Sequence, residues 1–304
     1  MDYKLINKVE IILPCSLEND EYVDPENKYC RFCKKNEQST TFNNRSHAIP
    51  EFLGNLSLLM HTECDQCNSF FSKNYDTHLS VYTAFERSIL GIKGKNGIPN
   101  FQHDSLLINV KYIENKQQIG IDPKSNFLKI NMEKSTFTFN FPKNPFIPYS
   151  VYKSFIRMSF AFLPIEICNK LESTRLFLRT KNKIIEGSEV NTTVLKYTVK
   201  DHFKKLKLFI FQKAQESKVN RPEFISLFVY NDKAYQFHIP NKEMDNNTEK
   251  LQMNIIPVFE NVYDIETFNF NKTELERNHT EKLTFQFAGI DSRDKSENFL
   301  RSLE

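Results

Sequence analysis

Two pairs of cysteines with the same spacing are the strongest chemical signal in this sequence. Cys30 and Cys33 form the first pair and Cys64 and Cys67 the second, with two residues between the thiols of each pair. Such a gap lets both sulfurs of a pair reach one ion, and four thiolates complete the tetrahedral coordination of a structural zinc ion. Doubled pairs are typical of metal sites rather than of disulfide frameworks. The spacing therefore predicts a four-cysteine site for structural Zn²⁺.

Other interpretations of these thiols remain open. They could be buried thiols without a ligand, or they could hold an iron–sulfur cluster or act as a redox dithiol, although no βαβ pattern surrounds them. Cys15 and Cys168 stand outside the pairs, and Cys168 follows an apolar segment in which a small thiol suits a core. Met1-Asp2-Tyr3-Lys4 opens no apolar run of the kind that a secretory signal needs. The sequence therefore predicts a reducing, cytoplasmic location.

The residues between and directly after the pairs add a second pattern, in which a histidine, a proline and a glycine precede an asparagine. These residues are His47, Pro50, Gly54 and Asn68. The order resembles the HNH endonucleases of the ββα-metal class, whose zinc-stapled members carry His-x-x-Pro and Gly between two Cys-x-x-Cys pairs and Asn at the start of a helix. The resemblance covers residues 27–100 and implies a hairpin and a helix joined by zinc.

The resemblance implies roles for two of these residues. Hydrolysis of a phosphodiester needs an activated water and neutralisation of charge on the phosphoryl oxygens. His47 is the implied general base, because an imidazole with a pKa of about 6.5 can accept a proton at neutral pH. Asn68 is implied to give a carbonyl oxygen to a catalytic Mg²⁺ or Mn²⁺ ion, both of which favour oxygen ligands. The alternative for Asn68 is a plain helix N-cap, a position that favours asparagine.

The expected ion site departs from the family pattern. Many members carry Asp directly before the base as a metal ligand, and here Ser46 stands in that position with a weaker ligand, a hydroxyl. Asp76 or His78 could complete the site. Asp76 lies eight residues after Asn68, close to two helical turns, and so shares roughly the same face. Ser46, Asn68 and Asp76 are therefore the candidate ligands of the catalytic ion.

The loop that carries the base also departs from the pattern. Many members brace this loop with an Asn, and Leu59 takes that position here. Asn55 or His61 could supply the brace from nearby. Glu63 and Asp65, beside the second cysteine pair, are expected to face solvent.

Lysines near the predicted helix are candidates for substrate binding. Lys93 and Lys95 lie in a short span with Gly91, Gly94 and Gly97, in a chain that has only seven glycines. Exposed backbone amides and lysines suit contact with a nucleic-acid backbone rather than base reading. Lys73 near the start of the helix could face the same phosphates. An ordinary surface turn explains the span equally well.

Length and charge limit the possible classes of protein. The chain has 304 residues, a formal net charge of +3 and a mean hydropathy of −0.52. It has no apolar run of the roughly 18–20 residues that a membrane span needs, so no membrane partner is expected. The small net charge excludes strong global attraction to nucleic acid, although a local basic face is allowed.

The predicted helices and strands that hold these residues belong to separate domains, with a boundary near residue 101. We predict an N-terminal extension over 1–26, an HNH domain over 27–100 and an α+β C-terminal domain over 101–304, in which antiparallel strands surround a buried helix. The helix begins at Pro148 and ends at Phe162, because apolar residues lie on nearly every face. A hairpin turn is predicted over Tyr230–Ala234. The predicted strands are 105–113, 127–132, 136–141, 206–211, 224–230, 234–239 and 252–259.

The leading hypothesis is a metal-dependent DNA endonuclease whose C-terminal domain binds DNA, senses a signal or docks a protein partner or second copy. Restriction or anti-phage defence is a fold-level analogy. The alternatives are a non-catalytic zinc-stapled adaptor with a degenerate site, which Ser46 and Leu59 support, and a toxin or RNA-directed nuclease.

Overall fold

Helices and strands are mixed along the chain, with a strand-rich domain after the segment that carries the cysteines, and this confirms the predicted α+β class. None of the described helices is long and apolar enough to cross a membrane. The computed structural model describes residues 2–13, 21–24, 28–94, 97–103, 108–113, 116–121, 127–181, 184–185, 188–199, 205–217, 220–245 and 253–286.

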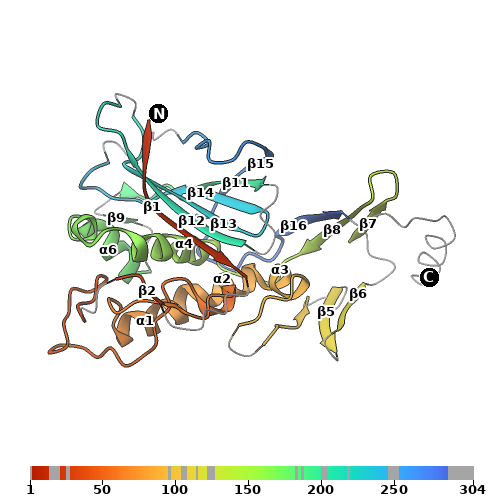
Figure 1. Cartoon of the computed structure of the whole chain (residues 1–304), viewed down its shortest axis with the longest axis horizontal. Helices are drawn as coiled ribbons and strands as arrows, with labels where there is room; N and C mark the ends of the chain where they lie inside the picture. The colour runs from red at the N-terminus through yellow and green to blue at the C-terminus, as the bar shows by residue number, and fades with distance from the viewer. Residues whose placement is uncertain are drawn as a thin grey trace.

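A six-stranded antiparallel sheet forms one layer of the molecule and lies over the helices (Figure 1). Its first strand comes from the predicted N-terminal extension, because β1 (Tyr3–Ile12) pairs with β12 (Lys205–Lys213). The weak alternation of apolar residues in β1 reflects its place at the edge of the sheet, where many of its side chains stay partly exposed. In spatial order the other strands are β13 (Phe224–Tyr230), β14 (Lys233–His238), β11 (Thr193–Val199) and β15 (Val262–Asn269).

The predicted hairpin between β13 and β14 is confirmed. Tyr230 pairs with Lys233, so Asn231 and Asp232 form a two-residue turn, and Asn231 has a φ of 57°. The strand predicted over 252–259 is wrong. Residues 253–259 join no ladder, and their apolar side chains instead cover one face of the sheet around Ile256, which explains the apolar pattern.

The predicted central helix is confirmed as α4 (Pro148–Phe162). Proline occupies its first turn, where no backbone N–H is needed, and all fifteen residues are buried. Phe155 stacks on Phe237 at a ring-centroid distance of 5.5 Å, which fixes one side of α4 on the sheet. The other side contacts the helices that follow the second cysteine pair, so α4 lies between two layers (Figure 1).

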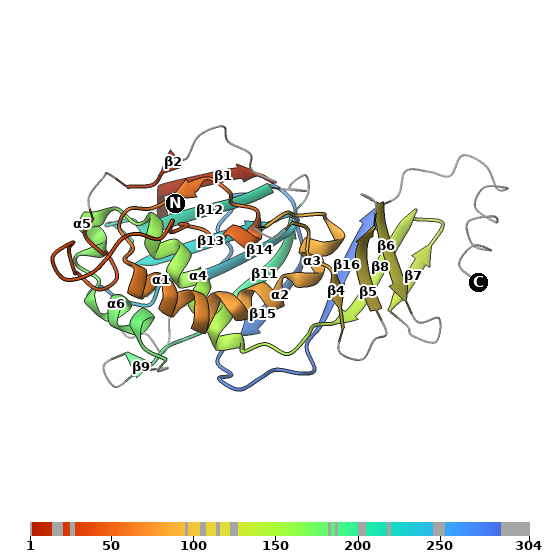
Figure 2. The same ribbon diagram turned by 90° about the horizontal axis from the view of Figure 1, so that it is seen from below.

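Three short helices and a π-helical turn begin at the second cysteine pair, and the π-helical turn and the second of these helices contact α4, in front of which they lie in Figure 2. Two further helices follow α4. The bounds are α1 (Asp65–Phe71), η2 (Ser72–Asp76, the π-helical turn), α2 (Thr77–Tyr82), α3 (Ala84–Ile89), α5 (Ile165–Cys168) and α6 (Glu172–Arg179), with a 3₁₀ turn η1 (Glu51–Leu53) before them.

Two small antiparallel sheets lie beside the large one (Figure 2). One contains β16 (Thr280–Gln286), β8 (Thr136–Pro142) and β7 (Leu128–Asn131), which confirms the strands predicted at 136–141 and 127–132. The other contains β4 (Phe101–Gln102), β5 (Ile108–Ile113) and β6 (Lys116–Ile121). Residues 105–107 of the predicted strand 105–113 lie outside the described residues. Two-stranded pairs are β2 (Glu21–Tyr22) with β3 (Leu58–Leu59), and β9 (Ile184–Ile185) with β10 (Ser188–Glu189).

One apolar core joins segments that the sequence assigns to different domains. Its buried members run from Ile11 through Phe71 and Phe155 to Phe270. The boundaries at residues 26 and 100 stay predictions, but the side chains on either side of them pack together.

Candidate metal centre and nuclease site

The first cysteine pair lies in a tight backbone turn. Lys34 N donates to Cys30 O (2.8 Å), and Cys30 N donates to Lys35 O (2.8 Å). Lys34 has a φ of 59°, the left-handed conformation that reverses the chain directly after Cys33. These bonds fix the two sulfurs on the same side of the turn.

The second cysteine pair lies at the start of α1. Cys64 is the N-cap residue and Cys67 is in the first turn, so their spacing places both thiols near the helix N-terminus. Asn68 is the fourth residue of α1, and its backbone N–H donates to Cys64 O (2.9 Å). The N-cap alternative for Asn68 is therefore wrong, because Cys64 occupies that position.

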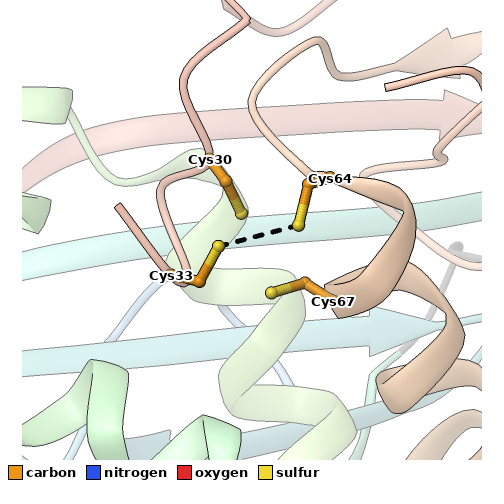
Figure 3. A group of neighbouring side chains, drawn as sticks. All are labelled: Cys30, Cys33, Cys64 and Cys67. Atoms are coloured by element: carbon orange, nitrogen blue, oxygen red, sulfur yellow. Dashed lines mark hydrogen bonds between the residues drawn. The ribbon is translucent and has the colours of Figure 1, made fainter. Parts of the chain in front are cut away.

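The two pairs converge on one point (Figure 3). All four sulfurs lie within 4.8 Å of one another, and Cys33 Sγ is 3.6 Å from Cys64 Sγ. A tetrahedral ion with metal–sulfur bonds of about 2.3 Å would place its sulfurs about 3.8 Å apart, so the four thiols fit such an ion. Hydrogen bonds from Cys30 and Cys67 lower the pKa of Cys64, and hydrogen bonds within the cluster raise the pKa of Cys30 and Cys67, so an ion that binds here would displace protons from these thiols.

Cys168 lies apart from this cluster. Cys168 is buried among backbone carbonyls at the end of α4, in agreement with a core role, and burial raises its pKa to about 11. Cys15 lies outside the described residues.

Arg31 fixes the first knuckle, the turn that carries Cys30 and Cys33, to the C-terminal end of α4. The second knuckle is the turn that carries Cys64 and Cys67. The Nη1 atom of Arg31 donates to Phe160 O (2.9 Å) and Ala161 O (2.6 Å), and also to the carbonyl of Leu163 (3.1 Å). The last carbonyls of a helix lack partners within the helix and carry its negative dipole end, so a buried guanidinium satisfies and stabilises them. The metal centre is thereby joined to the central helix.

A short antiparallel hairpin precedes the second knuckle. His47 bridges Leu59, Ala48 N donates to Leu58 O (3.3 Å), and Met60 N donates to Ser46 O (3.0 Å). The chain then enters α1, so two extended segments and a helix follow one another. This is the ββα order.

The side chain of Asn55 braces the hairpin loop. It is fully buried, and its Nδ2 donates to Ile49 O (2.7 Å) and Leu58 O (2.9 Å) while its Oδ1 accepts from Leu58 N (2.8 Å). His61, the other candidate brace, instead stacks on Tyr22 at 3.7 Å. Asn55 thus does the work that the family pattern places at the position of Leu59.

Gly54 allows the hairpin loop to close against the N-terminal segment. It has a φ of 95°, and a Cβ built there would lie 2.7 Å from Leu13 Cδ2. A side chain at this position would therefore be strained and crowded.

The His47 imidazole has an unpartnered nitrogen. Its Nε2 is buried and accepts or donates no hydrogen bond among the described residues. Burial lowers the pKa of His47, Arg45 and Arg157 lower it further, and Glu51 opposes them. The lowered pKa favours the neutral imidazole, whose unpartnered Nε2 is shielded from solvent in this arrangement.

A comparison with protein-family models identifies this arrangement. Residues 30–82 match the HNH endonuclease family model. The match begins at Cys30 and ends at Tyr82, the last residue of α2, so it contains both knuckles, the hairpin and α1; we refer to residues 30–82 as the HNH segment. No curated protein and no solved structure matches the chain.

Two of the three candidate ligands of a catalytic ion are occupied within the HNH segment. Ser46 is buried and its hydroxyl donates to Glu63. Asp76 Oδ1 accepts from Ser154 Oγ (3.0 Å), and its Oδ2 lies 3.7 Å from Arg157 Nη1. The Ser46 hydroxyl is committed to Glu63, and Asp76 lies beside the buried Arg157 guanidinium, which repels a divalent cation, so neither residue fits an ion site in this arrangement.

Asn68 differs from these two residues. Its half-buried side chain makes no hydrogen bond to a described residue, so its amide oxygen is available. The Nδ1 atom of His78 is not available to an ion, because it accepts a hydrogen bond from Ile147 N (3.2 Å).

Two of the three candidate substrate lysines, Lys73 and Lys93, are described by the structure, and they lie on different elements. Lys73 is exposed on η2 and lines an open groove of about 750 Å³ with Gln66, Ser69 and Lys181. Lys93 is exposed in the loop after α3. Lys95 lies outside the described residues.

Sequence reasoning missed Arg157 of α4, which contacts the His47 backbone from outside the HNH segment. Glu63, expected to face solvent, is only 2% exposed and pairs with Arg157 of α4. Asp65 does lie near the surface, where it accepts hydrogen bonds from the Asn43 and Asn44 amides. The sequence did hold a signal for this pair. Arg157 lies in a helix predicted to be buried, and a buried charged side chain needs a polar partner.

Proposed function

We propose that this chain is an endonuclease that hydrolyses phosphodiester bonds in DNA, with His47 as the general base. The observation that carries the proposal is the HNH endonuclease match over residues 30–82, which coincides with the four-cysteine cluster and the ββα order. The state of His47 supports it, because a neutral imidazole with an unpartnered Nε2 can take a proton from water. The water then attacks phosphorus in line with the leaving oxygen.

We propose Zn²⁺ as the ion of the cysteine cluster, since four thiolates in tetrahedral reach select zinc over harder ions. The zinc would hold the hairpin against α1 and contribute folding free energy directly. Four thiolate ligands would leave such an ion without an open coordination position for chemistry.

The charge on the phosphate also needs neutralisation. A Mg²⁺ or Mn²⁺ ion would supply it when bound, and Asn68 is the candidate ligand with an available oxygen. Lys73 and Lys93 are exposed and can contact phosphates, and Lys95 stays a candidate by its position in the sequence. We further propose DNA as the substrate, a cytoplasmic location consistent with the free cysteines, and a role in restriction or anti-phage defence by analogy alone.

A specific observation favours a second candidate function. Ser46 is bound to Glu63, and Asp76 to Ser154 and Arg157, rather than to an ion, which suits a non-catalytic, zinc-stapled adaptor that binds nucleic acid or protein. In that case the HNH segment acts as a rigid scaffold.

A cleavage assay separates the two functions. Wild type, His47→Ala and the control His61→Ala are incubated with supercoiled plasmid and with RNA in Mg²⁺, Mn²⁺ or EDTA. We expect wild type and His61→Ala to nick DNA with a divalent ion and His47→Ala to lose at least about tenfold in rate. Equal rates for wild type and His47→Ala would show that His47 is not the base. No cleavage by a wild-type protein that holds one zinc ion per chain would support the adaptor.

A further inference from the structure

We propose that Arg157, from the central helix α4, is the positioning residue that sets the backbone of the candidate base His47. The proposal rests on the proposed nuclease function for its catalytic consequence. Its structural part concerns His47 alone and can be tested without activity. Arg157 lies outside the HNH segment, so this role would make the nuclease site a joint product of two parts of the chain.

Arg157 forms a buried, two-point ion pair with Glu63. Its Nε is 3.2 Å from Glu63 Oε1 and its Nη2 is 2.6 Å from Glu63 Oε2. The side chains are 2% and 0% exposed. A buried pair of this kind gives little net stability over an apolar pair of the same volume, but its fork geometry fixes direction. The pair is therefore better suited to placing groups than to holding the fold together.

The groups that this pair places are two consecutive residues of the hairpin. The same Nη2 of Arg157 donates to the backbone carbonyl of His47 (3.2 Å). Ser46 donates its hydroxyl to the Glu63 carboxylate. Arg157 thus holds the backbone of His47 directly. It holds the neighbouring Ser46 through Glu63, the residue that directly precedes the second cysteine pair.

The opposite side of the guanidinium faces the helical part of the site. Nη1 lies 3.7 Å from Asp76 Oδ2, and the guanidinium carbon is 5.5 Å from the centre of the Phe71 ring in α1. Ser154, one turn earlier on α4, donates to the other oxygen of Asp76 (3.0 Å). One cation therefore contacts both the hairpin and the helical segment of the ββα unit and fixes their relative position.

The helix that carries the guanidinium is itself held in place. Every residue of α4 is buried, one side of the helix packs on the six-stranded sheet, and Arg31 holds its C-terminal carbonyls. The position of the His47 hairpin is consequently fixed relative to the sheet, through α4, as well as by the cysteine cluster. Without Arg157 the zinc would still join the knuckles and Ala48 and Ile49 would still pack in the core, but the His47 carbonyl would lose its direct hydrogen bond to α4.

The test uses three variants of the full-length protein. Arg157→Met/Glu63→Leu removes both charges, so neither is left buried alone. Arg157→Lys keeps the charge but loses the fork that reaches Glu63 and the His47 carbonyl together. The matched control is Lys153→Met, which removes another buried cation one turn away on α4 that contacts Phe177 rather than the hairpin.

Two kinds of measurement are made. Zinc content and the unfolding temperature report the fold, and kcat and KM on a DNA duplex report catalysis. The imidazole resonance of His47 in protein with ¹³C-labelled histidine, assigned with His47→Gln, reports position at one fixed pH, with His61 as internal reference.

We expect the double variant to keep its zinc and its KM within about twofold, to lose roughly 10–100-fold in kcat, and to shift the His47 resonance but not that of His61. Arg157→Lys should fall between this variant and wild type, and Lys153→Met should match wild type in zinc content, kcat, KM and the His47 resonance. An unchanged His47 resonance in the double variant overturns the proposal. If the double variant does not fold, the His47 resonance of Arg157→Lys tests the proposal instead, and an unchanged resonance there overturns it. If wild type cleaves nothing, the nuclease function fails, while the resonance still decides whether Arg157 positions His47.

Discussion

Replacement of Lys153 by methionine should change the pH dependence of stability in a predictable way. The buried Lys153 ammonium donates to the carbonyls of Phe177 (2.6 Å) and Thr180, and it lies 4.2 Å from the Phe177 ring centre and 5.2 Å from that of Tyr149. No carboxylate among the described residues pairs with it. Burial therefore lowers the pKa of Lys153 from 10.5 to about 7.

The sign of the effect follows from which state binds the proton more tightly. Between pH 7 and 10.5 the unfolded chain holds this proton and the folded chain does not, so unfolding becomes less favourable as pH rises. Below about pH 7 the full cost of burying the charge is present, and above 10.5 it is gone. At about 1.4 kcal/mol per pKa unit, this shift corresponds to about 4–5 kcal/mol.

The assay is urea unfolding of wild type and Lys153→Met followed by circular dichroism from about pH 6 to 10. The unfolding free energy of wild type minus that of the variant should rise by about 1.4 kcal/mol per pH unit above pH 7, because other titrating groups cancel in the difference. Lys129→Met, at an exposed lysine of β7, should show no such slope. A difference that does not change with pH would show that Lys153 keeps its ordinary pKa when folded and would refute the reasoning.

Three further predictions concern the HNH segment. Purified protein should contain one zinc ion per chain, and Cys33→Ser or Cys67→Ser should lose it and lower the unfolding temperature; metal-free wild-type protein that melts normally would contradict this. Asn55→Ala leaves the Ile49 and Leu58 carbonyls without their donor, so its unfolding free energy should fall by about 2–4 kcal/mol, measured by urea unfolding, and a loss below about 0.5 kcal/mol would count against the brace. Asn68→Ala should raise the Mg²⁺ concentration needed for half-maximal cleavage without lowering the unfolding temperature, since the side chain makes no hydrogen bond to a described residue; unchanged Mg²⁺ dependence would remove Asn68 as a ligand.

Features set by local spacing could be predicted from the sequence. The two-residue gaps of the cysteine pairs determine where the sulfurs point, and the four sulfurs do converge. The helix at Pro148–Phe162 follows from a proline in the first turn and apolar side chains on all faces. The turn at Asn231-Asp232 follows from residues that tolerate left-handed backbone.

Features set by distant contacts could not be predicted in this way. Glu63 next to the thiols has the composition of a surface position, and only the approach of Arg157 from α4 makes its burial possible. Residues 253–259 have the apolar content of a strand, but they cover a sheet whose neighbouring strands are already paired. Neither partner can be read from the residues on either side of it.

The pairing of β1 with β12 affects the order in which the protein can assemble. Tyr3 pairs with Lys213 and Ile12 with Lys205, so β1 has to wait for a strand that is synthesised much later before it finds its neighbour. The closing loop is long, and its entropic cost slows the step. The HNH segment is likewise synthesised before α4 and before the sheet on which α4 packs. During synthesis the nascent chain therefore carries the cysteine pairs and His47 well before the contacts that complete their surroundings exist.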